Sequence, residues 1–170
     1  MYILKRYTSK YIGVLLNTEL QYCTFVDVFY HKASYTPLKE MLVLLGEQAR
    51  NHRVTLHYLM EELLLSPTDT GSEGLRGIFR EAFYMIEDTE DDELVDEMMI
   101  FSLIQAAYFK LSYYQHILDL FRQKGLKLYI QRIEDIISVE EEAIAQLKRI
   151  QNELQCAKFG KITEEPFVIC

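Results

Sequence analysis

A chain of 170 residues is long enough to bury a hydrophobic core, and its 49% apolar content excludes a largely disordered protein. The net charge of −8 disfavours nucleic acid and anionic membrane surfaces as partners. No charge-free run approaches the ~20 residues that span a bilayer, and no signal peptide follows the N-terminal charges. The cysteines Cys23, Cys156 and Cys170 are scattered and odd in number, so we expect free thiols in the cytoplasm.

Apolar residues at steps of three and four predict two long helices in the first half of the chain, over 9–32 and 37–65. Thr36 and Pro37 suit the N-cap and the first position of the second helix. Glu19 lies on the expected apolar row of the first helix, which comprises Ile12, Leu16, Cys23, Val26 and Tyr30. The second helix has a heptad row with one polar member, namely Leu38, Leu42, Leu45, Ala49, His52, Leu56, Leu59 and Leu63.

A loop and a short amphipathic helix are expected next. Residues 66–74 combine Ser, Pro, Asp, Thr and Gly, which is typical of a loop. The short helix that follows carries Leu75, Phe79, Ala82 and Ile86 on one face. We expect it to cross from one end of the bundle to the other.

The third long helix is predicted over 90–124, with Thr89 as its cap and Gly125 as its C-terminal stop. Its centre, residues 98–109, contains no charge, so neighbours should cover it on several sides. The expected apolar row is Ile100, Ile104, Ala107, Leu111, Tyr114, Leu118 and Phe121, widened by Phe101 and Tyr108. A stripe this wide exceeds what one bundle covers, so we expect a homodimer.

The tight turn at Gly125 predicts that the last helix, over 127–157, is antiparallel to the one before it. Glu140 lies in register with its apolar row, which comprises Ile130, Ile133, Ile137, Ile144, Leu147 and Ile150 or Gln151. Residues 159–170 lack helical periodicity, so we divide the chain into a bundle over 1–158 and a C-terminal tail over 159–170. The predicted fold is all-α: a ferritin-like four-helix bundle of two helical hairpins joined by a short crossing helix.

Three ionisable residues intrude on these apolar rows: Glu19, His52 and Glu140. Di-iron carboxylate bundles use a Glu from each of two helices and Glu-x-x-His from the other two. Ala49 stands where the Glu before His52 would be, and the last helix has no His. We therefore favour His52 as a core histidine bonded to Glu19 or Glu140, with no cofactor. The alternative is a site for one metal ion, iron, held by Glu19, His52 and Glu140.

Three segments carry a family resemblance. Residues 74–81 read GLRGIFRE, residues 111–113 read LSY ahead of Leu118 and a Lys-Gly turn, and residues 139–142 read VEEE. They resemble, in order, the short middle helix, the third long helix and the last helix of the YciE/YciF-like bacterial stress proteins of the ferritin-like superfamily. The resemblance covers roughly 15–150. It implies the bundle fold and a stress-related protein, and it allows a dimer.

The metal site that this resemblance implies mostly fails to carry over. The first-helix Glu falls on Cys23, and the second-helix Glu-x-x-His becomes Ala49 with His52 kept. The third-helix Glu-His-Tyr-Glu becomes AAYF at 106–109, so only the last-helix acids remain. We therefore expect a structural or interaction protein that lacks a complete di-iron site and is not an enzyme. The alternative is an iron-binding protein with a residual site or weak oxidase activity.

Overall fold

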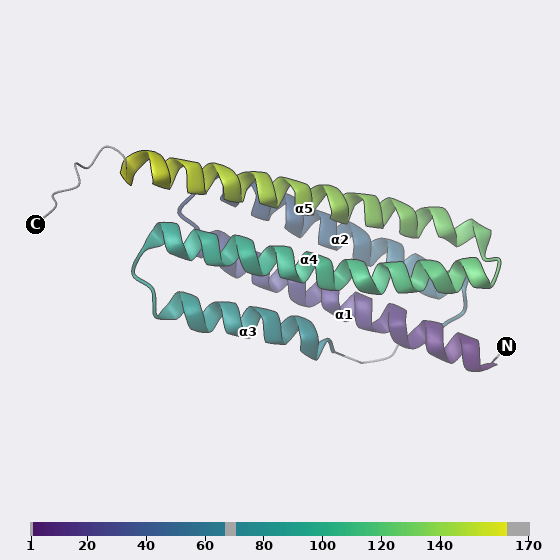
Figure 1. Ribbon diagram of the computed structural model, residues 1–170. Coiled ribbons are helices and arrows are strands. Elements are labelled where there is room, and N and C mark those ends of the chain that lie inside the picture. The colour runs from purple at the N-terminus through teal and green to yellow at the C-terminus, as the bar shows by residue number, and fades with distance from the viewer. Residues whose placement is uncertain (1, 67–70, 163–170) are drawn as a thin grey trace, which may run out of the picture.

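A computed structural model describes residues 2–66 and 71–162, and side-chain surroundings within 6–66 and 71–157. Over these ranges the chain forms helices and no strand (Figure 1). The helices are α1 (Tyr2–Lys32), α2 (Thr36–Glu62), α3 (Glu73–Glu87), α4 (Asp92–Gln123) and α5 (Lys127–Ile162). The predicted all-α class is confirmed.

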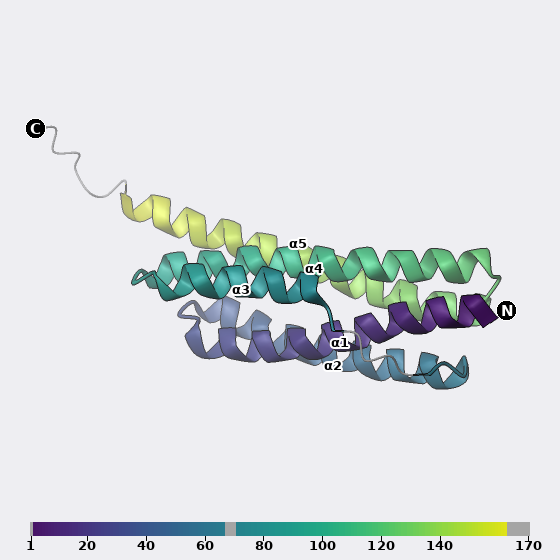
Figure 2. The ribbon, with the colours of Figure 1, turned by 90° about the horizontal axis from the view of Figure 1, so that it is seen from below.

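Two antiparallel hairpins, α1 with α2 and α4 with α5, pack side by side as the predicted four-helix bundle. α1 also contacts α4, and α2 contacts α5. The chain leaves α2 at one end of the bundle, and α4 begins at the other end (Figure 1). Figure 2 shows α3 along the outside of the bundle, where it packs on α4 and α1. This long connection lets α2 and α4 run in the same direction, as in ferritin-like bundles.

The helix boundaries differ from the predicted ones at several places. α1 begins at Tyr2 rather than at residue 9, and the hydroxyl of Ser9 donates to the carbonyl of Ser66 instead of capping α1. The α2 N-cap is Tyr35, without a side-chain hydrogen bond, so Thr36 is the first helical residue. α5 continues to Ile162, four residues into the predicted tail, and 163–170 lie outside the described residues.

The start of α4 also differs, because Asp91 and not the predicted Thr89 caps this helix. Asp91 is the N-cap, and its carboxylate accepts hydrogen bonds from the backbone N–H groups of Glu93 and Leu94. The hydroxyl of Thr89 instead donates to the carbonyl of Met85 in α3. At the other end of α4, Gly125 has a φ of +65°, the left-handed conformation expected of a glycine that ends a helix.

The core follows the predicted α2 row closely, since every member except the half-buried Leu63 is buried. In α1 the predicted members Ile12, Glu19 and Val26 are buried. The rest of the buried row is Leu15, Tyr22 and Phe29, whereas the predicted Leu16 and Cys23 are only half-buried and Tyr30 is exposed. The reason lies in α3, where Phe79 packs against the rings of the inward aromatic residues, with centroids 6.0 Å from Tyr22 and 5.6 Å from Phe29.

The apolar stripe of α4 is narrower than predicted. Phe101 and Tyr108 are 51% and 48% exposed, and Ile104 is half-buried, while Leu103 beside it is fully buried. α1, α3 and α5 all pack on this helix, so it is covered on several sides as expected, while the side that carries Phe101 and Tyr108 stays exposed. On α5 the expected row holds, with Ile133, Glu140, Ile144 and Leu147 buried and Ile130, Ile137 and Ile150 half-buried. Within the described ranges, no helix has the length and apolar character needed to traverse a membrane.

Candidate functional site

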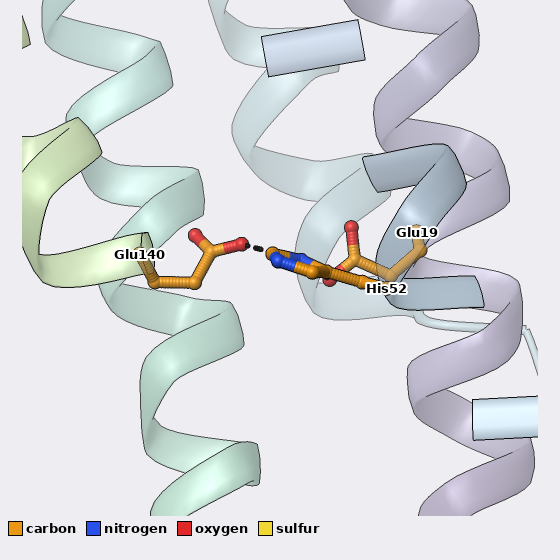
Figure 3. A group of neighbouring side chains, drawn as sticks. All are labelled: Glu19, His52 and Glu140. Carbon is orange, nitrogen blue, oxygen red and sulfur yellow. Dashed lines mark ion pairs between the residues drawn. The ribbon is translucent and has the colours of Figure 1, made fainter. Parts of the chain in front are cut away.

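Three of the four long helices bring the predicted ionisable residues together at the centre of the bundle (Figure 3). Glu19 comes from α1, His52 from α2 and Glu140 from α5, and they are 0%, 5% and 3% exposed. One potential ligand atom of each lies within 4.8 Å of the others. His52 Nδ1 is 3.2 Å from Glu140 Oε1 and 3.5 Å from Glu19 Oε1, as expected for a core histidine beside these acids.

α4 completes the cluster with two residues that the sequence analysis missed. Lys110 is 2% exposed, and its Nζ lies 2.6 Å from Glu140 Oε1 and 3.1 Å from Glu19 Oε2. The hydroxyl of Tyr114, one turn later, donates to Glu19 Oε1 over 2.6 Å. The ammonium of Lys110 also lies 4.0 Å from the ring centroid of Tyr22, a cation–π contact. We call these six residues the ionic cluster.

A signal for Lys110 was present in the sequence. Leu103, Ala106, Lys110, Tyr114 and Ile117 follow one another at steps of three and four, and all five are buried. A lysine on such a row is exceptional, because an unpaired buried ammonium is costly. This row was a signal that a carboxylate from another helix could face the lysine, and the sequence analysis did not use it.

Neighbouring charges in the ionic cluster determine the protonation states of Glu19 and Lys110. Burial alone would raise the pKa of Glu19, but the Lys110 ammonium, His52 and Tyr114 outweigh burial and lower it to about 2. Burial alone would lower the pKa of Lys110, but the carboxylates of Glu140 and Glu19 outweigh burial and raise it. Glu19 is therefore an anion and Lys110 a cation at neutral pH.

The imidazole of His52 can supply a second positive charge. Burial lowers its pKa, and the neighbouring carboxylates of Glu140 and Glu19 more than reverse this, so that the net shift is upward. Nδ1 has no partner with the alignment of a hydrogen bond, so its contact with the two carboxylates is an ion pair. When His52 is protonated, two carboxylates face two cations and the group is neutral.

His52 also connects the ionic cluster with the surface. It lines a groove of about 670 Å³ between α2 and α5, together with Asn51, Thr55, Asp135 and Val139. Nδ1 itself has no exposed surface, so another edge of the ring borders the groove. The ring of His52 therefore separates this groove from the carboxylates of the ionic cluster.

The residues at the centre do not fit a di-iron site. Glu19, His52 and Glu140 are three donors, whereas a di-iron bundle uses four carboxylates and two histidines. α4 contributes an ammonium and a phenol in place of a carboxylate. Cys23, where the family resemblance placed a ligand, lies outside the cluster, with Sγ 3.8 Å from the carbonyl oxygen of Gly46. Whether the three donors bind a single ion stays a prediction.

Two hairpins, a long connection and an inward polar cluster define a ferritin-like bundle. No protein-family model and no curated protein sequence matches the chain. The stress protein YciF of E. coli superposes with a TM-score of 0.84 at 16% identity, over 91% of this chain and 98% of YciF. At this identity the likeness shows the fold alone: the chain has the ferritin-like fold of YciF.

Two further solved structures share the fold. A ferritin-like, diiron-carboxylate protein from Bacillus anthracis str. Ames gives a TM-score of 0.70 at 15% identity, covering 89% of this chain and 99% of its own. YcfI from Rhodopseudomonas palustris, described as a proposed structural protein, gives 0.67 at 14% identity, covering 85% and 88%. Proteins with and without a named metal centre therefore share this fold, so the function has to be argued from the site.

Proposed function

We propose that this chain is a ferritin-like structural or interaction protein with a role in the stress response, and that it is not an iron oxidase. The observation that carries the proposal is the contribution of α4 to the centre, where Lys110 and Tyr114 bind Glu19 and Glu140. An oxidase would need metal ions with open coordination positions at this place. Here both oxygens of Glu19 and Oε1 of Glu140 already accept hydrogen bonds from donors of the protein itself.

Iron oxidation tests the proposal directly. Fe²⁺ added to the aerobic wild-type protein should be oxidised no faster than in buffer, as followed by absorbance. The melting temperature should also move by less than about 1 °C, because a site at a hundredfold excess over Kd would add about 2.7 kcal/mol, or several degrees. Faster oxidation that Glu19→Gln removes would contradict a non-enzymatic role.

A residual metal protein is the second candidate, and one observation favours it. The donors of Glu19, His52 and Glu140 converge from three helices, as the ligands of a single ion would. This candidate predicts about one equivalent of iron or zinc in protein purified without chelator, as determined by elemental analysis. His52→Gln should then abolish the bound metal. Absence of metal from the wild type, with no uptake on dialysis against Fe²⁺ or Zn²⁺, would remove this candidate.

We also propose that the protein acts as a homodimer in the cytoplasm. The exposed rings of Phe101 and Tyr108 on α4 support an association through this helix, although Tyr108 also binds Lys148 of its own chain. Light scattering at high concentration should give twice the mass of the chain, and Phe101→Glu should lower it. A monomer mass for the wild type would rule the dimer out.

A further inference from the structure

We propose that Lys110 is a built-in counter-ion which takes the place of a metal ion in the bundle centre and thereby prevents metal binding there. This inference deepens the proposed non-enzymatic function and rests on it. It adds a cause: Glu19, His52 and Glu140 could bind a divalent ion, and the positive charge of Lys110 prevents this binding.

The ammonium of Lys110 contacts three groups of the ionic cluster. Its three N–H groups are matched by Glu140 Oε1 at 2.6 Å, Glu19 Oε2 at 3.1 Å and the ring face of Tyr22 at 4.0 Å from the centroid. Because Lys110 is only 2% exposed and makes all three contacts, its ammonium is shielded from solvent. The ammonium is therefore a fixed part of the centre.

Three of the four carboxylate oxygens at the centre already accept hydrogen bonds from Lys110 or Tyr114 of α4. Glu140 Oε1 accepts from Lys110 and is also the oxygen nearest to His52 Nδ1. Glu19 Oε1, the oxygen that faces His52, accepts from the hydroxyl of Tyr114. A divalent ion between these donors would have to displace hydrogen bonds and would meet a like charge at short range.

Electrostatic balance explains why a lysine can stand in for the metal. Two buried carboxylates are strongly destabilised unless cations face them. In a metal-binding bundle the ions provide that charge, and here Lys110 provides it from within the chain. Without the lysine, one point in the bundle centre would be surrounded by the carboxylates of Glu19 and Glu140 and by Nδ1 of His52, which has no aligned hydrogen bond. Such a set of three protein ligands suits Zn²⁺ or Co²⁺.

Lys110→Met tests this inference, because methionine keeps a long flexible side chain and removes the charge. Lys148→Met is the matched control, since Lys148 is an exposed lysine that binds the hydroxyl of Tyr108. Each protein is titrated with Co²⁺, followed by visible absorption and by melting temperature. We expect one Co²⁺ per chain in Lys110→Met only, with a rise of about 5 °C or more at a hundredfold excess over Kd. The wild type and Lys148→Met should shift by less than about 1 °C.

The origin of the new site is checked in the double variant Lys110→Met/His52→Gln, which should lose the bound Co²⁺. Two results would overturn the inference: a folded Lys110→Met that binds no more Co²⁺ than the wild type, or a wild type that already binds one equivalent at this centre. Iron oxidation by the wild type would instead remove the proposed function. The two failures are thus distinguishable.

If Lys110→Met does not fold in the absence of metal, two further measurements still test the counter-ion role of Lys110. Refolding that succeeds only with Zn²⁺ supports the inference, because the metal then replaces the missing charge. Where Zn²⁺ does not rescue it, Lys110→Met/Glu19→Gln removes one negative charge together with the positive one. Recovery of a folded protein in that variant supports the counter-ion role, and failure shows that Lys110 is needed for its packing, which overturns the inference.

Discussion

The carboxylate of Asp96, on α4, holds Ser34 in the turn between α1 and α2. The backbone N–H of Ser34 donates to Oδ1 over 3.0 Å, and its hydroxyl donates to Oδ2 over 2.5 Å. Oδ2 also accepts from the backbone N–H of Tyr35, the N-cap of α2, over 2.9 Å. Asp96 is 1% exposed, so the two hairpins are joined by a buried acid at the end of the bundle as well as by the ionic cluster at its centre.

Asp96→Ala should destabilise the protein by about 3 kcal/mol, because it leaves the three donors at Ser34 and Tyr35 without their acceptor. For a chain of this size that corresponds to a melting temperature lower by roughly 6–12 °C. Urea denaturation provides the measurement. Asp27→Ala, at an exposed acid on α1, is the control and should change the unfolding free energy by less than about 0.5 kcal/mol. Equal midpoints for the two variants would show that the Asp96 contacts are not stabilising.

Two glycines of α3 should respond in opposite directions to replacement by alanine. A Cβ at Gly74 would lie 2.6 Å from the ring of Phe109, so Gly74→Ala should displace α3 from α4 and cost about 1–3 kcal/mol. A Cβ at Gly77 meets nothing within 4 Å, so Gly77→Ala should stabilise the helix by about 0.5–1 kcal/mol. Thermal melts of the pair make the comparison. A stabilised Gly74→Ala would mean that α3 does not pack closely on Phe109.

Acid should unfold the protein partly through Glu19. The folded pKa of Glu19, about 2, lies below its ordinary value of 4.5, so its contribution is complete above pH 4.5 and is lost as the pH falls towards 2. At about 1.4 kcal/mol per pH unit, the difference is worth about 3 kcal/mol. Urea denaturation between pH 6 and pH 2.5 should show this loss in the wild type and a smaller one in Glu19→Gln. Glu141→Gln, at an exposed position on α5, should behave like the wild type.

The contribution of His52 to stability should be lost at high pH and not at low pH, because its pKa in the folded protein is raised above 6.5. Its contribution is complete below pH 6.5 and is lost as the pH rises through the folded pKa, when the two carboxylates face Lys110 alone. His52→Gln should retain the fold, since Gln can donate and accept hydrogen bonds, and should lose this dependence between pH 6 and 9. Identical pH profiles of unfolding free energy in the two proteins would refute the role given to the imidazolium.

Much of the fold could be predicted because the spacing of apolar residues along each helix can be read from the sequence of that helix alone. The α2 row was predicted almost residue by residue, since its leucines follow one heptad pattern without an apolar neighbouring row. In α1 two adjacent rows are apolar, so the pattern could not choose between Leu15, Tyr22 and Phe29 and their neighbours. Contact with Phe79 on α3 settles that choice, and a local pattern does not contain this contact.

The candidate site was predicted only in part for a related reason. Glu19, His52 and Glu140 were conspicuous as polar residues on apolar rows, and they do converge. Lys110 ends the charge-free segment of α4, and a charge at the end of such a segment is typical of a surface position. Its burial is stable only because carboxylates arrive from α1 and α5, so it depends on the packing of distant segments.

A crystal structure of the wild-type protein grown with excess Zn²⁺ tests the central claim most directly. We expect no anomalous peak between Glu19 and Glu140, and the ammonium of Lys110 within hydrogen-bond distance of both carboxylates. A zinc peak bound by Glu19, His52 and Glu140, with Lys110 turned away from them, would contradict it.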